Sequence, residues 1–163
     1  MNAMRVLTAM EEDTRIVVTT YRPDFDGDIM DLCQLFVKES LHEYGLNVTQ
    51  ERADQMTCIC KNEAFFIVDN GRAVGVIAGL IVDCLTNGKP ALQEVIWFVN
   101  PEYRKHGHKL LKAFEDRAKE LRVSSIVMGL MVNSMQERLD KLYKKMGYRP
   151  FEVQYIKELE YGA

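Results

Sequence analysis

Two Asn-Gly pairs constrain the fold of this chain more than any other feature, because each lies between apolar, β-prone runs. Asn70-Gly71 and Asn87-Gly88 separate three such runs, at residues 64–68, 73–84 and 92–99. Asn-Gly supplies the two positive-φ residues of a type I′ turn, the tight turn that joins neighbouring antiparallel strands. The pairs therefore predict a three-stranded antiparallel meander in the middle of the chain.

The segment before this meander predicts one strand and two helices. Arg15–Tyr21 is rich in β-branched residues and predicts a first strand. Apolar residues then recur at helical spacing from Ile29 to Tyr44, and Gly45 is a typical residue to end that helix. Residues Thr49–Cys60 predict a second, shorter helix.

After the meander, a helical period from Leu110 to Leu121 is followed by a buried strand over Ser124–Val132. A capping box, Ser134-x-x-Glu137, begins another helix that ends at Gly147, and Phe151–Leu159 predicts a last strand. This order predicts an α/β (α+β) fold, with a mixed central sheet flanked by helices. We expect one domain over residues 1–163, with residues 1–14 as a short N-terminal extension.

The composition excludes several classes of protein. A net charge of −3 and a pI near 5.7 argue against general nucleic-acid binding, which needs a broad basic surface. The four cysteines lack the spacing of a zinc site, so we expect no metal and reduced thiols. The most apolar stretch, Ala73–Val82, is shorter than the roughly 20 residues that cross a bilayer, and the first dozen residues lead us to expect no secretory signal. We expect a cytoplasmic protein that binds no membrane.

Five cationic or imidazole side chains gather near the start of the helix that follows Pro101. They are Arg104, Lys105, His106, His108 and Lys109, and Gly107 lies among them. A helix N-terminus already carries partial positive charge and unpaired amides, so cations there favour a bound phosphate or pyrophosphate. The alternative is a solvated basic loop.

Two motifs resemble the signatures of the GNAT superfamily of N-acetyltransferases. Val99-x-Pro101-x-Tyr103-Arg104-x-x-Gly107 is similar to its acetyl-CoA signature, R/Q-x-x-G-x-G/A after a strand that ends in V-x-P. Asn133 and the later LYKKMGY are similar to its second signature. The resemblance extends from about Arg15 to the end of the chain and implies a mostly antiparallel sheet; Lys109 departs from it, because the family has a small residue there. The strand with Trp97 also resembles compact acetyltransferases of phage genomes.

The resemblance implies transfer of an acetyl group from acetyl-CoA to an amine within a ternary complex. The pyrophosphate would bind the amides of Lys105–Lys109, and backbone amides near Phe98 and Val99 would stabilise the oxyanion. Tyr143 would protonate the departing thiolate, and Asn133 would bind the pantetheine arm. The alternative roles are a ring on an apolar helix face for Tyr143 and a helix cap for Asn133.

Glu94 is the candidate base, directly or through water, because an amine must lose a proton before it attacks. Its alternative is a solvated outward side chain. The resemblance places the acceptor near residues 42–44, Glu152 and Tyr155, and implies an amine-bearing small molecule or protein amine as acceptor. A homodimer is common in the family. The competing function is a catalytically degenerate protein that binds acyl-CoA or a protein partner without turnover.

Overall fold

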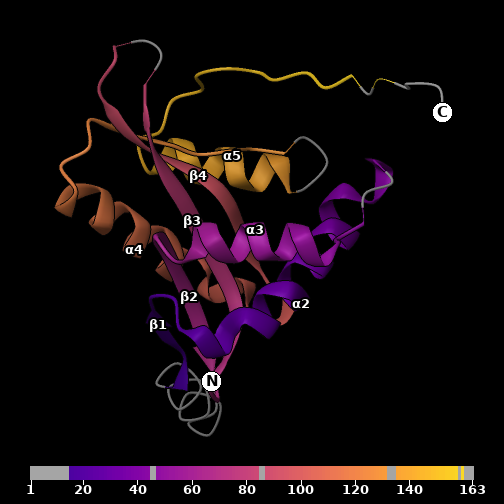
Figure 1. The fold of residues 1–163 in the computed structure, drawn as a ribbon. Helices are drawn as coiled ribbons and strands as arrows, with labels where there is room; N and C mark the ends of the chain where they lie inside the picture. Colours follow the sequence, from indigo (N-terminus) through magenta and orange to yellow (C-terminus); the bar gives the residue numbers. More distant parts are fainter. Residues whose placement is uncertain (1–14, 45–46, 85–86, 132–134, 158, 160–163) are drawn as a thin grey trace, which may run out of the picture. The chain divides into compact units, whose positions relative to one another are not determined.

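A computed structural model describes residues 15–44, 47–84, 87–131, 135–157 and 159 of the chain (Figure 1). They fall into two compact units, one up to Gly129 and one from Leu130 onward. The first unit holds the sheet and three α-helices, and the second holds one α-helix and the C-terminal segment. The predicted N-terminal extension, residues 1–14, lies outside the described residues, and the single domain stays a prediction.

The predicted meander is confirmed. Strands β2 (Glu63–Asp69), β3 (Arg72–Asp83) and β4 (Pro90–Val99) pair antiparallel in chain order. The turn between β2 and β3 has φ values of 49° at Asn70 and 81° at Gly71. Both residues therefore adopt the left-handed conformation that a type I′ turn requires.

The second Asn-Gly pair does not form a type I′ turn, and that prediction is wrong. Gly88 has a φ of 64°, but Asn87 is not among the described residues with positive φ. Its side chain accepts a hydrogen bond from the Lys89 amide at 2.9 Å, and the Asn87 and Gly88 amides both donate to the Cys84 carbonyl. The asparagine thus stabilises a longer loop through its side chain, a common alternative use of this residue.

Two short strands extend the meander into a five-stranded sheet of order β1-β2-β3-β4-β5. Strand β1 (Val17–Thr19) pairs antiparallel with β2, and β5 (Ser125–Val127) pairs parallel with β4. The mixed, mostly antiparallel sheet confirms the predicted fold class. Strand β5 is shorter than predicted, because the described residues after Val127 leave the ladder with β4.

Helices cover both faces of this sheet (Figure 1). On one face, α2 (Asp26–Phe36) and α3 (Gln50–Cys60) bury Ile29, Leu32 and Cys60 against Phe66 and Phe98 of the strands. On the other, α4 (Gly107–Glu120) buries an apolar stripe of Leu110, Leu111, Phe114 and Ala118. Each large apolar side chain buried in this way contributes about 1.5–3 kcal/mol.

A bulge interrupts the pairing of β3 and β4. Ala78 lies opposite Ile96, whereas Gly79 lies opposite Glu94, so Val95 is an extra residue of β4. A Cβ on Gly79 would lie 2.6 Å from both the Gln93 carbonyl oxygen and the Phe114 ring. Only glycine allows α4 to pack this closely on the bulge.

The helix predicted to run to Tyr44 changes geometry after Phe36. A π-helical turn, η2 (Val37–Leu41), follows α2, and a short 3₁₀ turn, η3 (His42–Tyr44), follows η2. The apolar stripe that predicted one helix is present, but its last turns are not α-helical. Gly45, the predicted end, lies outside the described residues.

The second unit contains α5 (Gln136–Lys145), which ends as predicted: Gly147 has a φ of 88°. The predicted cap Ser134 lies outside the described residues. The predicted last strand, Phe151–Leu159, is wrong: residues 151–157 and 159 form no strand. A strand needs a neighbour for its backbone groups, and alternating apolar residues alone do not supply one.

Candidate functional site

The cationic segment spans two helices rather than one helix N-terminus. The 3₁₀ helix η4 (Pro101–His106) is capped by Asn100, whose side chain accepts a hydrogen bond from the Glu102 amide at 3.4 Å. Proline is favoured at such a first helical position. Helix α4 begins directly after η4, and the Gly107 amide already donates to the Arg104 carbonyl. This amide of the predicted phosphate-binding group is therefore satisfied within the protein.

The five predicted cationic side chains differ in exposure. Lys105 and His108 are exposed, and Arg104 and Lys109 are half-buried. His106 is buried, so it does not contribute to a basic surface. The His108 Nδ1 lies 2.9 Å from the Lys105 carbonyl oxygen, which links η4 to the first turn of α4.

Gly107 lies against β4 with room for a methyl group. A Cβ there would lie 3.7 Å from Val99 and 3.8 Å from Trp97, both ordinary contact distances. The backbone is in the right-handed helical region, with a φ of −54°. Neither packing nor backbone geometry within the protein requires glycine at this position, which leaves close approach of a ligand as a reason for it.

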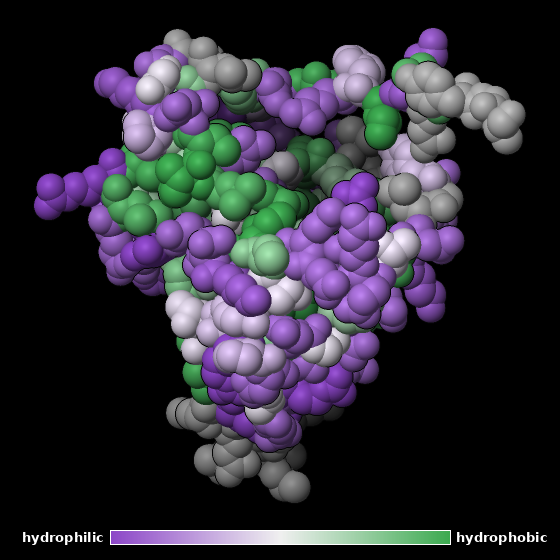
Figure 2. All heavy atoms as spheres, in the orientation of Figure 1, coloured by the Kyte–Doolittle hydropathy of each residue, from purple (hydrophilic) through white to green (hydrophobic). Residues whose placement is uncertain are grey.

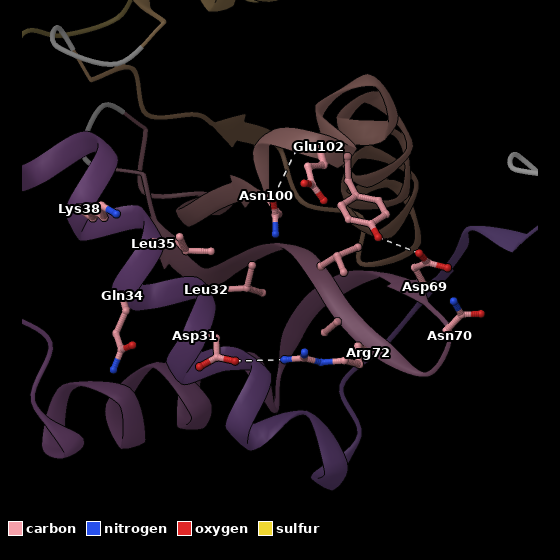
Figure 3. A pocket seen from close by; sticks show the side chains of 13 residues that line it. Asp31, Leu32, Gln34, Leu35, Lys38, Asp69, Asn70, Arg72, Asn100 and Glu102 are labelled. Carbon is pink, nitrogen blue, oxygen red and sulfur yellow. Dashed lines mark hydrogen bonds and ion pairs between the residues drawn. The ribbon is translucent and has the colours of Figure 1, made fainter. Parts of the chain in front are cut away.

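A buried carboxylate holds this loop against the β2–β3 turn. The Tyr103 hydroxyl donates to Asp69 Oδ2 at 2.7 Å (Figure 3). Arg15 forms an ion pair with the same carboxylate at 2.6 Å. Asp69 is only 7% exposed. The hydrogen bond raises the pKa of Tyr103, because the ionised phenol would lie beside a carboxylate. Sequence reasoning missed Asp69, whose one signal is an acidic residue ending an apolar strand.

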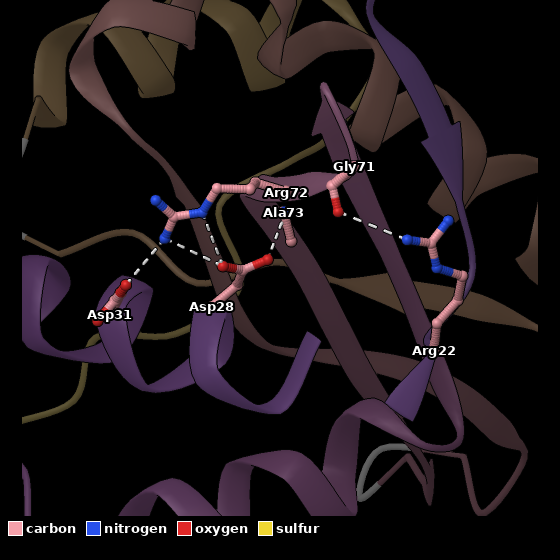
Figure 4. A network of polar contacts seen from close by, with 6 residues as sticks. All are labelled: Arg22, Asp28, Asp31, Gly71, Arg72 and Ala73. Carbon is pink, nitrogen blue, oxygen red and sulfur yellow. Dashed lines mark hydrogen bonds and ion pairs between the residues drawn. The ribbon is translucent and has the colours of Figure 1, made fainter. Parts of the chain in front are cut away.

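A second polar network fixes the β2–β3 turn to α2 (Figure 4). Asp28 accepts hydrogen bonds from the Ala73 amide at 2.7 Å and from the Arg72 guanidinium at 3.1 Å. Asp31 accepts from Arg72 as well. Because Asp69 precedes this turn, the network also determines where Asp69 meets Tyr103.

A cavity of about 630 Å³ opens between α2, the β2–β3 turn and η4 (Figure 3). Tyr103, Asn100 and Glu102 line it from the loop, and Leu35 and Lys38 line it from α2. Its remaining lining residues are Asp31, Leu32, Gln34, Asp69, Asn70, Arg72, Ala73 and Val74. The loop that carries the first signature therefore forms one wall of this cavity.

Arg104 reaches from η4 to the π-helical turn. Its guanidinium forms an ion pair with Glu39 of η2, and the two side chains are 32% and 33% exposed. The arginine of the first signature is thus paired with a carboxylate of its own chain. Sequence reasoning did not single out Glu39, which lies 65 residues away.

Glu94 spans the end of the β4–β5 ladder. The last parallel pair is Gln93 with Val127, and beyond it the Glu94 carboxylate accepts a hydrogen bond from the Gly129 amide at 2.8 Å. Burial raises the pKa of Glu94, and the hydrogen bond opposes part of this rise. Glu94 is therefore not a solvated outward side chain.

Phe98 and Val99, the predicted oxyanion segment, are both buried. The Phe98 ring packs edge-on against Phe36, with centroids 5.7 Å apart. The irregular part of β4 lies upstream, at Val95.

The remaining predicted site residues belong to other parts of the chain. Tyr143 is the buried residue of α5, and its ring lies 5.5 Å from that of Tyr148 within the same unit. Asn133 lies outside the described residues. Glu152 and Tyr155 are exposed.

Among the described residues, no group of three or more His, Cys, Asp or Glu side chains is arranged to hold a metal ion. Within the same residues, no helix combines the length and the apolar character needed to cross a membrane.

Comparison with known proteins identifies one family. The sequence profile of the Acetyltransferase (GNAT) family matches residues 29–148. A search of curated proteins found no match. Ribosomal-protein-alanine N-acetyltransferase from Brucella melitensis biovar Abortus 2308 is similar in structure, with a TM-score of 0.67 at 15% identity over 89% of this chain and 99% of that one.

Two aminoglycoside-related structures are also similar. An aminoglycoside acetyltransferase from an uncultured soil metagenomic sample has a TM-score of 0.69 at 13% identity, over 91% of this chain and 99% of that one. AAC(6')-Iy, in complex with the bisubstrate analog CoA-S-monomethyl-acetylneamine, has a TM-score of 0.68 at 13% identity, over 89% and 98% of the two chains. At such identities the likeness shows a shared fold.

Proposed function

The chain belongs to the GNAT acetyltransferase family, and from this premise we propose that it transfers an acetyl group from acetyl-CoA to a primary amine. The observation that carries the proposal is the loop Tyr103–Lys109, in which the exposed Lys105 and the half-buried Lys109 flank a glycine that the protein's own packing does not require. Tyr103 and Asp69 hold this loop before any ligand binds. Such preorganisation favours pyrophosphate binding, because less ordering remains to be done.

The reaction is a direct attack within a ternary complex. The amine nitrogen forms a bond to the thioester carbonyl carbon, the carbon–sulfur bond breaks, and the sulfur leaves as a thiolate. Glu94 takes the proton that the ammonium must lose, and a raised pKa improves a carboxylate for this role. Tyr143 donates a proton to the thiolate, and the second proton, which the nitrogen loses once it is bonded to the carbonyl carbon, restores the phenol. Asn133 binds the pantetheine arm, and amides near Phe98 and Val99 stabilise the oxyanion.

The acceptor is an amine-bearing small molecule or a protein amine. Both kinds appear in the names of similar structures, an aminoglycoside acetyltransferase and a ribosomal-protein-alanine N-acetyltransferase. We also propose a cytoplasmic location, which the four free cysteines support, and a homodimer, which the exposed C-terminal segment supports.

The proposal is tested by incubating the protein with acetyl-CoA and a panel of amines and measuring thiol release. Tyr143→Phe is expected to lower kcat while leaving the Kd of CoA nearly unchanged, because only the departing thiolate needs the phenol. Unchanged turnover in this variant would remove Tyr143 as the acid. CoA binding without turnover of any amine would favour the degenerate acyl-CoA-binding alternative, and failure of CoA to raise the Tm would remove both functions.

A further inference from the structure

The arginine of the first signature is paired with a carboxylate of the same chain. Arg104 lies on η4, Glu39 lies on η2, and their ion pair joins the two elements. A guanidinium presents a planar fork of donors to a carboxylate or to a phosphate. Glu39 and a pyrophosphate therefore compete for the same donors of Arg104.

The backbone around Glu39 is shaped for this contact. The π-helical turn Val37–Leu41 inserts an extra residue into the helix, which changes the direction of the side chains that follow. Ser40, next to Glu39, is only 2% exposed and anchors the turn in the interior. Just before the turn, the Phe36 ring packs on Phe98 of β4. The turn thus presents Glu39 to η4 from a fixed position.

The strength of the pair suits an exchange of partners. An ion pair that is about one-third exposed contributes little to stability. A pyrophosphate offers more charge and more oxygens than one carboxylate, and its contacts with Arg104 are correspondingly stronger. Donor binding can therefore displace Glu39 at a small cost in affinity.

We propose that Glu39 pairs with Arg104 in the free protein. Binding of the donor to Arg104 frees the Glu39 carboxylate, which then binds the ammonium group of a cationic amine acceptor. This inference rests on the proposed function. The released carboxylate lies on the segment that leads into η3 (His42–Tyr44), the predicted acceptor wall. Donor binding then favours acceptor binding, because Glu39 is more available to the acceptor once Arg104 has a new partner.

The first test is calorimetric titration of the full chain with CoA. Glu39→Gln removes the competing charge and keeps the side-chain size, so we expect CoA to bind about two- to fivefold more tightly. Glu51→Gln, which removes the same charge from an exposed position of α3, is the matched control for general electrostatics. In an Arg104→Gln background, Glu39→Gln should have no effect on CoA affinity.

Steady-state kinetics test the second half of the exchange. Glu39→Gln should raise the KM of a cationic amine about fivefold or more with little change in kcat, because a hydrogen-bonded ion pair to the ammonium is lost. Wild-type protein that does not bind CoA would refute the proposed function itself. If wild type binds CoA but Glu39→Gln leaves the affinity unchanged or weakens it, the exchange is refuted. The exchange is also refuted if Glu51→Gln raises the CoA affinity as much as Glu39→Gln does, or if Glu39→Gln raises it equally in the Arg104→Gln background. An unchanged KM for the cationic amine would refute it as well.

Discussion

Gly107 is surrounded by side chains that would accept a methyl group, at 3.7 Å from Val99 and 3.8 Å from Trp97. We expect Gly107→Ala to leave the free energy of unfolding unchanged or to raise it by up to about 1 kcal/mol, as alanine favours the helix. CoA affinity should fall about tenfold or more, because the methyl group would occupy the space of the pyrophosphate. Urea unfolding and calorimetry measure the two effects, and undiminished CoA affinity would contradict this role of the glycine.

Glu94 should make stability depend on pH. Its pKa is raised in the folded state, so its stabilising contribution is complete below the unfolded pKa, about 4.3, and is lost as the pH rises through the folded pKa. Glu94→Gln does not titrate, and its amide oxygen can still accept from Gly129. The variant should therefore gain stability relative to wild type as the pH rises from about 4 toward neutrality. Tm measured against pH tests this, and parallel curves for the two proteins would contradict it.

The structural role of a single residue could be predicted where it depends on the adjacent residues in the sequence. Asn70 and Gly71 were predictable because a type I′ turn depends on two adjacent residues. The partners of Tyr103 and Arg104 were not, because Asp69 and Glu39 lie 34 and 65 residues away. Long-range polar pairs leave no local pattern, and they are the contacts that position the candidate site.

The bulge of β4 depends on one glycine of the neighbouring strand. We expect Gly79→Ala to lower the free energy of unfolding by about 1–3 kcal/mol, because the new methyl group would overlap the Gln93 carbonyl and the Phe114 ring. The matched control is Gly27→Ala in α2, where a Cβ meets nothing within 4 Å. Urea unfolding of both variants measures the difference, and equal stability would show that the bulge tolerates a side chain.

Helices and strands were predictable where their backbone partners lie close to them in the sequence. The strands of the meander were recognised because each predicted strand has the next one beside it in the chain. The bulge at Val95 and the π-helical turn at Val37–Leu41 were not predicted, since each depends on packing against a distant element rather than on the local period. Both irregularities lie beside the residues that carry the proposed chemistry.

At the scale of the whole molecule, periodicity and turns were sufficient to predict the mixed sheet and the order of elements as far as α5. Structures only 13–15% identical in sequence share this fold. Many different side chains can therefore satisfy the same apolar pattern, and the pattern carries little information about the acceptor. The C-terminal segment has the alternating pattern of a strand but no strand partner among the described residues.

That segment predicts self-association. Val153 and Tyr155 are 74% and 94% exposed, and Phe151, Ile156 and Leu159 are exposed as well. An exposed apolar segment with alternating character is stabilised by pairing with another strand, and two identical segments can pair around a two-fold axis. We expect a homodimer in sedimentation equilibrium, and Val153→Glu should shift it toward monomer by placing a charge in the paired face. Gln154→Glu adds the same charge at the alternate position and should leave the dimer intact, so a monomeric wild-type protein, or equal effects of the two variants, would contradict this arrangement.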